Sequence, residues 1–191
     1  MIAVRLADRR DAADIAAIYR PFVTSTIISF EIDPPDEAQM ADRMAHTIVR
    51  YPWLVVECDG RIAGYAYATR HRERAAYQWS VDTSAYLHPD YWRKGLGRRL
   101  YRSLIAILTA QGFVNAYAGI TLPNPASVGL HEAVGFQPLG VYRSVGYKLG
   151  AWHDVGWWEL RLRNPGVSPS APTDIATLQE TGDLDKLLTR T

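Results

Sequence analysis

The pattern of apolar and polar residues predicts strands and helices that follow one another irregularly along the chain. Short alternating or apolar runs predict strands at 3–7, 53–58, 61–68, 77–87, 115–121, 141–148 and 155–163. Apolar residues three or four positions apart predict helices that begin after Asp8 or Asp11, after Pro35, at Leu96 and at Pro125. Asp59-Gly60 predicts a hairpin turn, and Pro21 is expected to end the first helix nearby. This order predicts an α+β fold, a mixed and mostly antiparallel sheet flanked by helices.

The composition of the chain changes after residue 163. Residues 164–172 read Asn-Pro-Gly-Val-Ser-Pro-Ser-Ala-Pro, which is typical of a flexible linker. We therefore expect one domain over residues 1–163. Residues 164–191 are expected to form a Pro/Ser-rich linker and a polar tail with at most one weak helix.

Composition and charge favour a soluble globular protein and exclude several classes. The chain has 191 residues, 48% of them hydrophobic, and a formal net charge of +1, so nothing indicates general binding to nucleic acid or to an anionic membrane. Cys58 is the only cysteine, which excludes an intramolecular disulfide and a multi-cysteine metal site. A single thiol fits a reducing compartment, and we expect a cytoplasmic protein.

A basic glycine turn, Arg93-Lys-Gly-Leu-Gly-Arg98, lies between a predicted strand and a predicted helix. Gly95 and Gly97 allow a tight turn and a close approach of the backbone to a ligand. The N–H groups at the start of the helix and the cationic side chains would suit a pyrophosphate. A plain strand-to-helix turn also explains the glycines, so this segment alone leaves both interpretations open.

This turn and the later segment Asn124–Phe136 resemble the GCN5-related N-acetyltransferases, and the resemblance covers residues 2–163. Within that superfamily the chain is similar to the phosphinothricin and methionine sulfoximine acetyltransferases. The stretches that match are Ile18–Val23, Ser29-Phe30, Gly64–Ala66, Tyr77–Ser84 and Gly146–Trp157. The resemblance implies acetyl-CoA as co-substrate, no metal, and acetylation of the α-amino group of a small, glutamate-like amino acid.

The resemblance also implies where acetyl-CoA binds. The pantetheine arm is expected to lie along the main chain of one strand and the pyrophosphate in the glycine turn. The expected contacts are Tyr86, Leu87, His88, Arg93, Lys94, Gly95, Leu96, Gly97, Arg98, Asn124 and Ser127. Asn124 and Ser127 also form a helix-cap pattern, which explains them equally well. Trp92 stands where the superfamily usually has Gln or Arg.

Asp82 and His131 are the catalytic candidates. Asp82 occupies the position of the subfamily's usual glutamate, where a base would deprotonate the substrate ammonium. His131 falls at the position of the superfamily's tyrosine acid, although a lone helical histidine is more often structural. A hydrogen-bonded structural carboxylate is the alternative interpretation of Asp82.

Three residues are expected to bind the substrate. Arg72 aligns with an arginine that holds the substrate carboxylate in the resembling enzymes, and Phe30 is expected to line the amino-acid pocket. Tyr77 is the third candidate. A solvated charged loop is the alternative for Arg72, a dimer contact for Phe30, and a core or interface role for Tyr77.

We therefore expect an N-acetyltransferase in which the amine attacks acetyl-CoA directly. Acetylation of another amine, such as a polyamine, an antibiotic or a protein N-terminus, is one alternative. A non-catalytic acyl-CoA-binding module is another. A nucleotide-phosphate domain is disfavoured because the turn lacks the P-loop Lys-Ser/Thr pair. Aromatic residues in the last strands, and the resembling enzymes, indicate a homodimer. No nucleic acid or membrane partner is expected.

Overall fold

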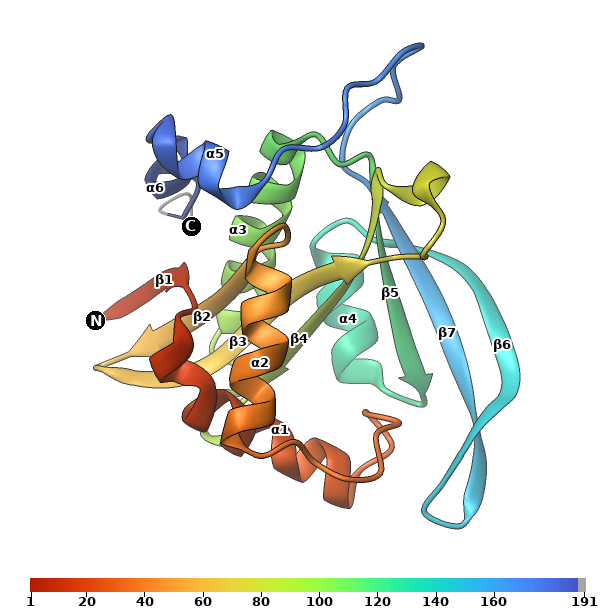
Figure 1. Cartoon of the computed structure of the whole chain (residues 1–191). Helices are drawn as coiled ribbons and strands as arrows, with labels where there is room; N and C mark the ends of the chain where they lie inside the picture. Colours follow the sequence, from red (N-terminus) through yellow and green to blue (C-terminus); the bar gives the residue numbers. More distant parts are fainter. Residues whose placement is uncertain (189–191) are drawn as a thin grey trace.

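A seven-stranded sheet with the order β1-β2-β3-β4-β5-β7-β6 forms the centre of the molecule in this computed structural model, which describes residues 1–188 (Figure 1). The strands are β1 Ile2–Leu6, β2 Trp53–Cys58, β3 Arg61–Arg70, β4 Ser80–Leu87, β5 Asn115–Leu122, β6 Gln137–Lys148 and β7 Ala151–Arg161. Only β4 and β5 are parallel, and the other neighbouring strands are antiparallel. The predicted α+β fold with a mixed, mostly antiparallel sheet is confirmed.

Helices cover both faces of this sheet (Figure 1). Their bounds are α1 Ala12–Ser25, α2 Glu37–Ile48, α3 Leu96–Gln111, α4 Pro125–Ala133, α5 Ile175–Glu180 and α6 Asp183–Leu188. On one face, Ile15, Met40 and Met44 of α1 and α2 pack with Trp53 and Tyr65. A second buried cluster lies on the other face, where α3 packs against residues of β2, β3 and β5. Burial of these apolar faces is the main term that holds the layers together.

Helix α1 continues through Pro21 to Ser25, so the prediction that Pro21 ends it was wrong. A proline inside a helix removes one hydrogen bond and costs about 3 kcal/mol. Ile18, Phe22 and Val23 are buried on both sides of Pro21. Each contributes about 1.5–3 kcal/mol when its side chain leaves water, which outweighs the defect.

Strand β4 begins at Ser80 and not at Tyr77, because Ala75–Tyr77 forms a 3₁₀ turn. The main-chain N–H of Tyr77 donates to the carbonyl of Arg74, and that of Gln78 donates to the carbonyl of Ala75. These bonds compete with the β-ladder for the backbone. The turn brings Tyr77 beside the end of β3, close to the candidate site.

The segment after residue 163 contains more structure than the sequence indicates. Ile175, Leu178 and Leu184 of α5 and α6 are buried in the same core cluster as α3. The side-chain amide of Gln111, at the end of α3, donates to the carbonyl of Thr173 at 2.8 Å. Residues 175–188 thus add apolar surface to the main core. Among the described residues, no helix is both long and apolar enough to span a bilayer.

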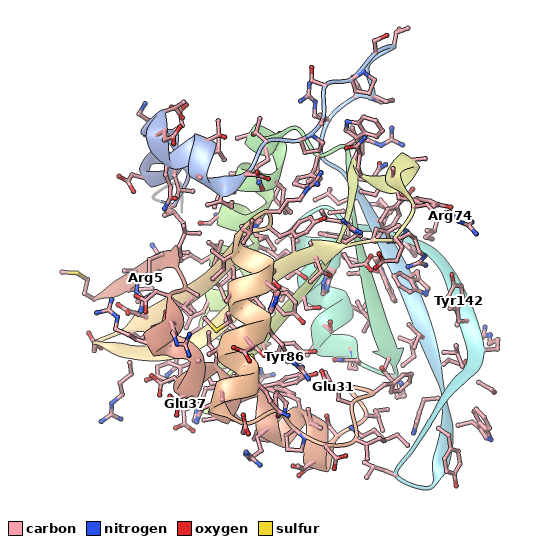
Figure 2. All side chains as sticks on the ribbon, in the orientation of Figure 1. Arg5, Glu31, Glu37, Arg74, Tyr86 and Tyr142 are labelled. Atoms are coloured by element: carbon pink, nitrogen blue, oxygen red, sulfur yellow. The ribbon has the colours of Figure 1, made fainter. Side chains whose placement is uncertain are left out.

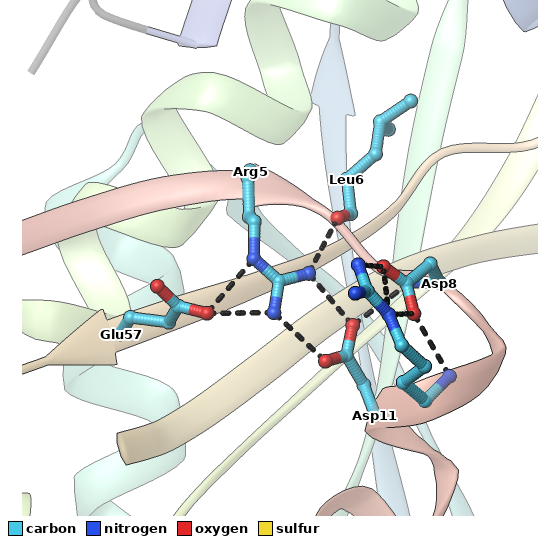
Figure 3. Close-up of polar contacts among 6 residues, drawn as sticks. Arg5, Leu6, Asp8, Asp11 and Glu57 are labelled. Atoms are coloured by element: carbon cyan, nitrogen blue, oxygen red, sulfur yellow. Dashed lines mark hydrogen bonds and ion pairs between the residues drawn. The ribbon is translucent and has the colours of Figure 1, made fainter. Parts of the chain in front are cut away.

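Arg5 ties the edge strand β1 to its surroundings (Figure 3). Its guanidinium pairs with both carboxylate oxygens of Asp11 at 2.7 Å, and with Glu57 of β2 at 2.6 Å. Asp11 immediately precedes α1, so this one side chain joins β1, β2 and the start of that helix. The hydrogen bond to Asp11 raises the pKa of Arg5 above its ordinary value despite partial burial.

Candidate active site

Strands β4 and β5 separate after a short stretch of pairing, and this opening is the centre of the site (Figure 1). They pair only at Ser80–Asn115, Val81–Ala116 and Asp82–Tyr117. Beyond this point β4 remains paired with β3 as far as Leu87, and β5 remains paired with β7. Main-chain groups on the facing edges are therefore available to an extended ligand that adds like a strand. Of the predicted cofactor contacts here, Leu87 directs its main chain to this edge, whereas Tyr86 pairs with Tyr65 of β3 and the N–H of His88 donates to the carbonyl of Ala63.

The basic glycine turn leads from the end of β4 into α3. Arg93 and Gly95 both have left-handed backbones, with φ of 61° and 78°. No side chain caps the N-terminus of α3, which begins at Leu96. Such a turn directs neighbouring N–H groups into one concavity that suits an anion. The structure thus brings Arg93, Lys94, Gly95, Leu96, Gly97 and Arg98 together at one end of the opening.

Trp92 joins this turn to β4. Its indole N–H donates to the main-chain carbonyl of Leu87 at 2.9 Å, while the ring remains half exposed. The side chain of His88 accepts a hydrogen bond from the N–H of Asp90 at 3.3 Å. The tryptophan therefore fixes the turn by a contact that does not depend on the usual Gln or Arg.

Helix α4 lies next to the start of α3. The side-chain oxygen of Asn124 accepts from the N–H of Ser127 at 3.1 Å and so caps α4. A Cβ on Gly97 would lie 2.9 Å from a methyl carbon of Leu130, so a larger residue here would make the Leu130 side chain move. Asn124 and Ser127 thus have a clear capping role.

His131 is buried and both of its ring nitrogens are engaged. Nε2 lies 2.6 Å from the hydroxyl of Tyr101, and Nδ1 lies 2.7 Å from the carbonyl of Ser127. A carbonyl accepts only, so Nδ1 carries a proton and Nε2 accepts from Tyr101. Burial lowers the pKa of His131, which favours this neutral form. This geometry does not favour His131 as a direct acid, and that role stays a prediction.

Asp82 lies where the two strands separate, and His71 is attached to it. Nδ1 of His71 is 2.6 Å from Oδ1 of Asp82. Burial raises the pKa of Asp82, and the hydrogen bond from His71 opposes that rise. Sequence reasoning missed His71. The only signal that would reveal it is the strand register, in which Thr69 of β3 lies opposite Asp82.

Aromatic side chains enclose His71. Its ring stacks on Tyr117 of β5 at a centroid distance of 4.5 Å, with the rings of Tyr77 and Trp157 edge-on to it at 6.0 and 6.5 Å. Arg72 follows directly, and its guanidinium lies 5.9 Å from the Trp157 ring centroid. The structure therefore groups two of the predicted substrate residues, Arg72 and Tyr77, around the His71–Asp82 pair.

Trp157 also lines a cavity of about 620 Å³. Loop 26–36 forms one wall, with Phe30 and Glu31, and strands β4 to β7 form the rest, including Tyr86, Gly119 and Tyr142. Figure 2 labels Tyr86 and Glu31 close together and Tyr142 across from them on β6. Phe30, the third predicted substrate residue, lies over Gly146, where a Cβ would come within 2.2 Å of its ring. The cavity suits a small ligand with an apolar part.

Hydrogen bonds hold loop 26–36 in place. The hydroxyl of Tyr19 lies 2.7 Å from that of Ser29 and donates to Glu31 at 2.9 Å. Arg43 of α2 pairs with both oxygens of Glu31 at 2.8 and 2.9 Å. The network fixes the cavity wall to α1 and α2. Within residues 1–188 no group of three or more His, Cys, Asp or Glu side chains is placed to hold a metal ion.

Comparisons with known proteins agree with this geometry. The model of the acetyltransferase (GNAT) domain family matches residues 4–157. The chain is 39% identical over 164 residues to a phosphinothricin N-acetyltransferase of Streptomyces viridochromogenes, covering 86% of this chain and 90% of the relative. It is 34% identical over 160 residues to an L-methionine sulfoximine/L-methionine sulfone acetyltransferase of Salmonella typhimurium, covering 83% and 94%.

A solved structure extends the comparison to the fold. The phosphinothricin acetyltransferase of Sinorhizobium meliloti in complex with acetyl-CoA superimposes with a TM-score of 0.84 at 35% identity. The match covers 91% of this chain and 94% of that one. The predicted resemblance to this superfamily is therefore confirmed at the level of sequence and of fold.

Proposed function

This chain belongs to the acetyltransferase (GNAT) domain family, and we propose that it transfers an acetyl group from acetyl-CoA to the amino group of a small amino acid. The proposed substrates are of the phosphinothricin or methionine sulfoximine type. The observation that carries the proposal is the opening between β4 and β5, with the left-handed glycine turn at one end and Asp82 at the point of separation. The names of the relatives support the substrate class.

The residues around the opening fit acetyl-CoA. The left-handed turn at Arg93 and Gly95 and the uncapped start of α3 offer N–H groups to a pyrophosphate. On the edge of β4 that faces the opening, the main-chain N–H of Leu87 is offered to pantetheine, while the Leu87 carbonyl accepts from Trp92. When bound, acetyl-CoA supplies the acetyl group as an activated thioester.

Deprotonation of the substrate is the task of the protein. A free α-ammonium is mostly protonated at neutral pH and is not a nucleophile, so a base must take one proton. Asp82 and its partner His71 form a basic centre where β4 and β5 separate. The neutral amine then attacks directly. Its second proton leaves with the departing thiol, and the proton held by the protein returns to solvent.

Substrate selection is assigned to the cavity wall and to the charged loop. Phe30 and Trp157, which line the cavity, contact the apolar part of the substrate's side chain. Arg72, held against Trp157, pairs with the α-carboxylate through its planar guanidinium. Tyr77 packs edge-on against His71 and forms the neighbouring part of the substrate site. His131 and Tyr101 act as a buried pair that supports β4 and α4.

A homodimer formed through the last two strands is part of the proposal. Strand β6 is the final strand of the sheet. Leu139, Tyr142, Tyr147 and Trp152 are exposed on the β6–β7 hairpin, an unusual set of large apolar side chains for a surface. Sedimentation equilibrium of the protein and of a Trp152→Ser variant tests this, because an interface there predicts a shift of the variant toward monomer.

The decisive experiment measures CoA release from acetyl-CoA with a thiol reagent. Phosphinothricin, methionine sulfoximine, other amino acids and polyamines are compared. Release restricted to glutamate-like amino acids is the expected result. Release with polyamines alone would keep the chemistry and overturn the substrate class. Acetyl-CoA binding without release across the panel would favour a non-catalytic acyl-CoA-binding module. Fractionation of the native cells tests the proposed cytoplasmic location.

A further inference from the structure

The link between His71 and Asp82 defines which ring nitrogen of His71 is basic. Nδ1 of His71 lies 2.6 Å from Oδ1 of Asp82. Among the described residues, the imidazole is the only group that can carry a positive charge in contact with this oxygen. A carboxylate accepts hydrogen bonds, so Nδ1 carries the proton. In the neutral ring, Nε2 then has a free lone pair.

Nothing else in the described chain uses that lone pair. Within residues 1–188, Nε2 of His71 makes no hydrogen bond. The atom is not fully buried, so solvent reaches it. The ring is otherwise well held, since its side chain is 14% exposed and stacks on Tyr117. A fixed ring with one orienting carboxylate and one open nitrogen is the arrangement of a general base.

Asp82 is a poorer candidate for direct contact with the amine. Its side chain is one methylene shorter than the glutamate of the resembling enzymes, and Oδ1 is already occupied by His71. We propose that the amine gives its proton to Nε2 of His71, while Asp82 holds the ring and stabilises its charged form. This inference rests on the proposed acetyl transfer and concerns the residue that performs its first step.

The step balances. The N–H bond of the substrate ammonium breaks, its electron pair remains on nitrogen, and the proton forms the Nε2–H bond of an imidazolium. Asp82 stays ionised and now faces a cation at hydrogen-bond distance, which lowers the free energy of that state. Solvent at Nε2 removes the proton after each turnover.

The groups facing His71 set the pH response. Asp82 of β4 lies within hydrogen-bond distance of the ring, and Arg72 follows His71 directly in the loop. Tyr77 and Tyr117 face the ring, and burial raises the pKa of Tyr117. From β7, Glu159 and Arg161 act with opposite signs on Tyr117, and Trp157 does not titrate. A general base accepts a proton only while its nitrogen is unprotonated, so the rate is expected to fall as pH decreases.

Two substitutions separate a base from a positioning residue. In His71→Asn, the side-chain N–H₂ takes the place of Nδ1–H and keeps a donor for Asp82, but Nε2 is lost. In Asp82→Asn, the ring remains and its orientation is disturbed. His46→Asn, on the exposed face of α2, is the matched control. Acetyl-CoA affinity, measured by calorimetry, is expected to remain unchanged in all three.

We expect His71→Asn to lower kcat by about 10²–10⁴-fold and to remove the acidic limb of the pH profile. Retention of wild-type kcat within about threefold, with a large loss in Asp82→Asn, would overturn the inference.

A second readout needs no turnover. Two-bond ¹H–¹⁵N spectra of the free protein are expected to show that His71 is protonated on Nδ1 only. The imidazole signals of His71 are assigned as those that disappear in His71→Asn. An Nε2–H tautomer would also overturn the inference. If the wild type acetylates no amine, the proposed function fails, and these spectra still decide whether Nε2 is the basic atom.

Discussion

The Nζ atom of Lys148 donates a hydrogen bond to the main-chain carbonyl of Ser29 at 2.6 Å. The same ammonium donates to the carbonyl of Val23, near the end of α1, at 2.5 Å. Lys148 is buried in β6, and burial lowers its pKa, an effect that the nearby Glu31 opposes. One side chain thus fastens the end of α1 and the loop over the cavity to the last strand of the sheet.

Replacement of Lys148 by Met removes both bonds and keeps most of the packing volume. Each buried carbonyl left without a partner costs about 1–3 kcal/mol, so the midpoint of thermal unfolding is expected to fall. Loop 26–36 loses its anchor, and the KM of the amine is expected to rise while acetyl-CoA affinity stays constant. Lys186→Met, at an exposed lysine of α6, is the control. An unchanged amine KM would show that the loop is held by other contacts.

Acid is expected to weaken the same loop through Glu31. Burial raises the pKa of Glu31, but hydrogen bonds from Arg43 and Tyr19 outweigh it and place the pKa below its ordinary value of 4.5. A depressed pKa adds stability that is present above pH 4.5 and is lost as pH falls through the folded-state value. The Glu31 carboxylate is about one-third exposed, and solvent screens its charge. Its contribution to the free energy of unfolding is therefore expected to be less than about 1 kcal/mol.

Thermal unfolding of the wild type and of Glu31→Gln between pH 7 and pH 3 measures this effect. The wild type is expected to be more stable at neutral pH, and the difference is expected to shrink in acid. Glu180→Gln, at an exposed position of α5, gives the baseline. A difference that is independent of pH would mean that the Glu31 carboxylate does not contribute to the anchor through its charge.

Gly146 is expected to control the position of Phe30. A Cβ at Gly146 would lie 2.2 Å from the Phe30 ring, whereas a Cβ at Gly140 of the same strand meets nothing within 4 Å. Gly146→Ala therefore forces the ring to move, and Gly140→Ala does not. We expect the first variant to raise the amine KM about tenfold and the second to leave it unchanged. Equal KM values would separate Phe30 from substrate binding.

Much of the fold follows from local sequence signals. Asp36 and Gln39 form the capping box that begins α2, and Asp59-Gly60 forms the predicted turn between β2 and β3 with φ of 51° and 79°. These signals act within a few residues and need no tertiary information. Pro21 misled the prediction because buried neighbours, which the sequence does not reveal, outweigh its local effect.

The site could be predicted only in part for the same reason. The glycine turn is continuous in sequence, and the resemblance placed it. His71 meets Asp82 only because β3 and β4 pair in one register, and Tyr101 meets His131 only because α3 and α4 pack closely. Contacts between distant segments depend on such packing, so neither partner was identified from the sequence.

Arg72 is expected to recognise the substrate carboxylate. A charge-assisted pair contributes about 1.5–3 kcal/mol, so Arg72→Ala should lower kcat/KM for an α-amino acid by roughly 10–100-fold. The same variant should have little effect on the matching amine that lacks the carboxylate. Arg70→Ala is the control, because that exposed arginine pairs with Glu73. An equal decrease in kcat/KM with both substrates would mean that Arg72 positions His71 and does not bind the carboxylate. Its guanidinium already donates to the main-chain carbonyl of His71 at 2.8 Å.

Gly95 offers the sharpest test of the turn, because a second glycine with the same backbone serves as its control. Gly95 has φ of 78° and Gly60, in the β2–β3 hairpin, has φ of 79°, and a Cβ at either position meets nothing within 4 Å. Alanine in a left-handed backbone costs about 1 kcal/mol at both positions, so the two variants should lose similar stability. Only Gly95→Ala disturbs the N–H groups at the start of α3, and we expect only this variant to bind acetyl-CoA more weakly, by about tenfold in calorimetric titration. Equal affinity in both variants would mean that the turn does not hold the pyrophosphate.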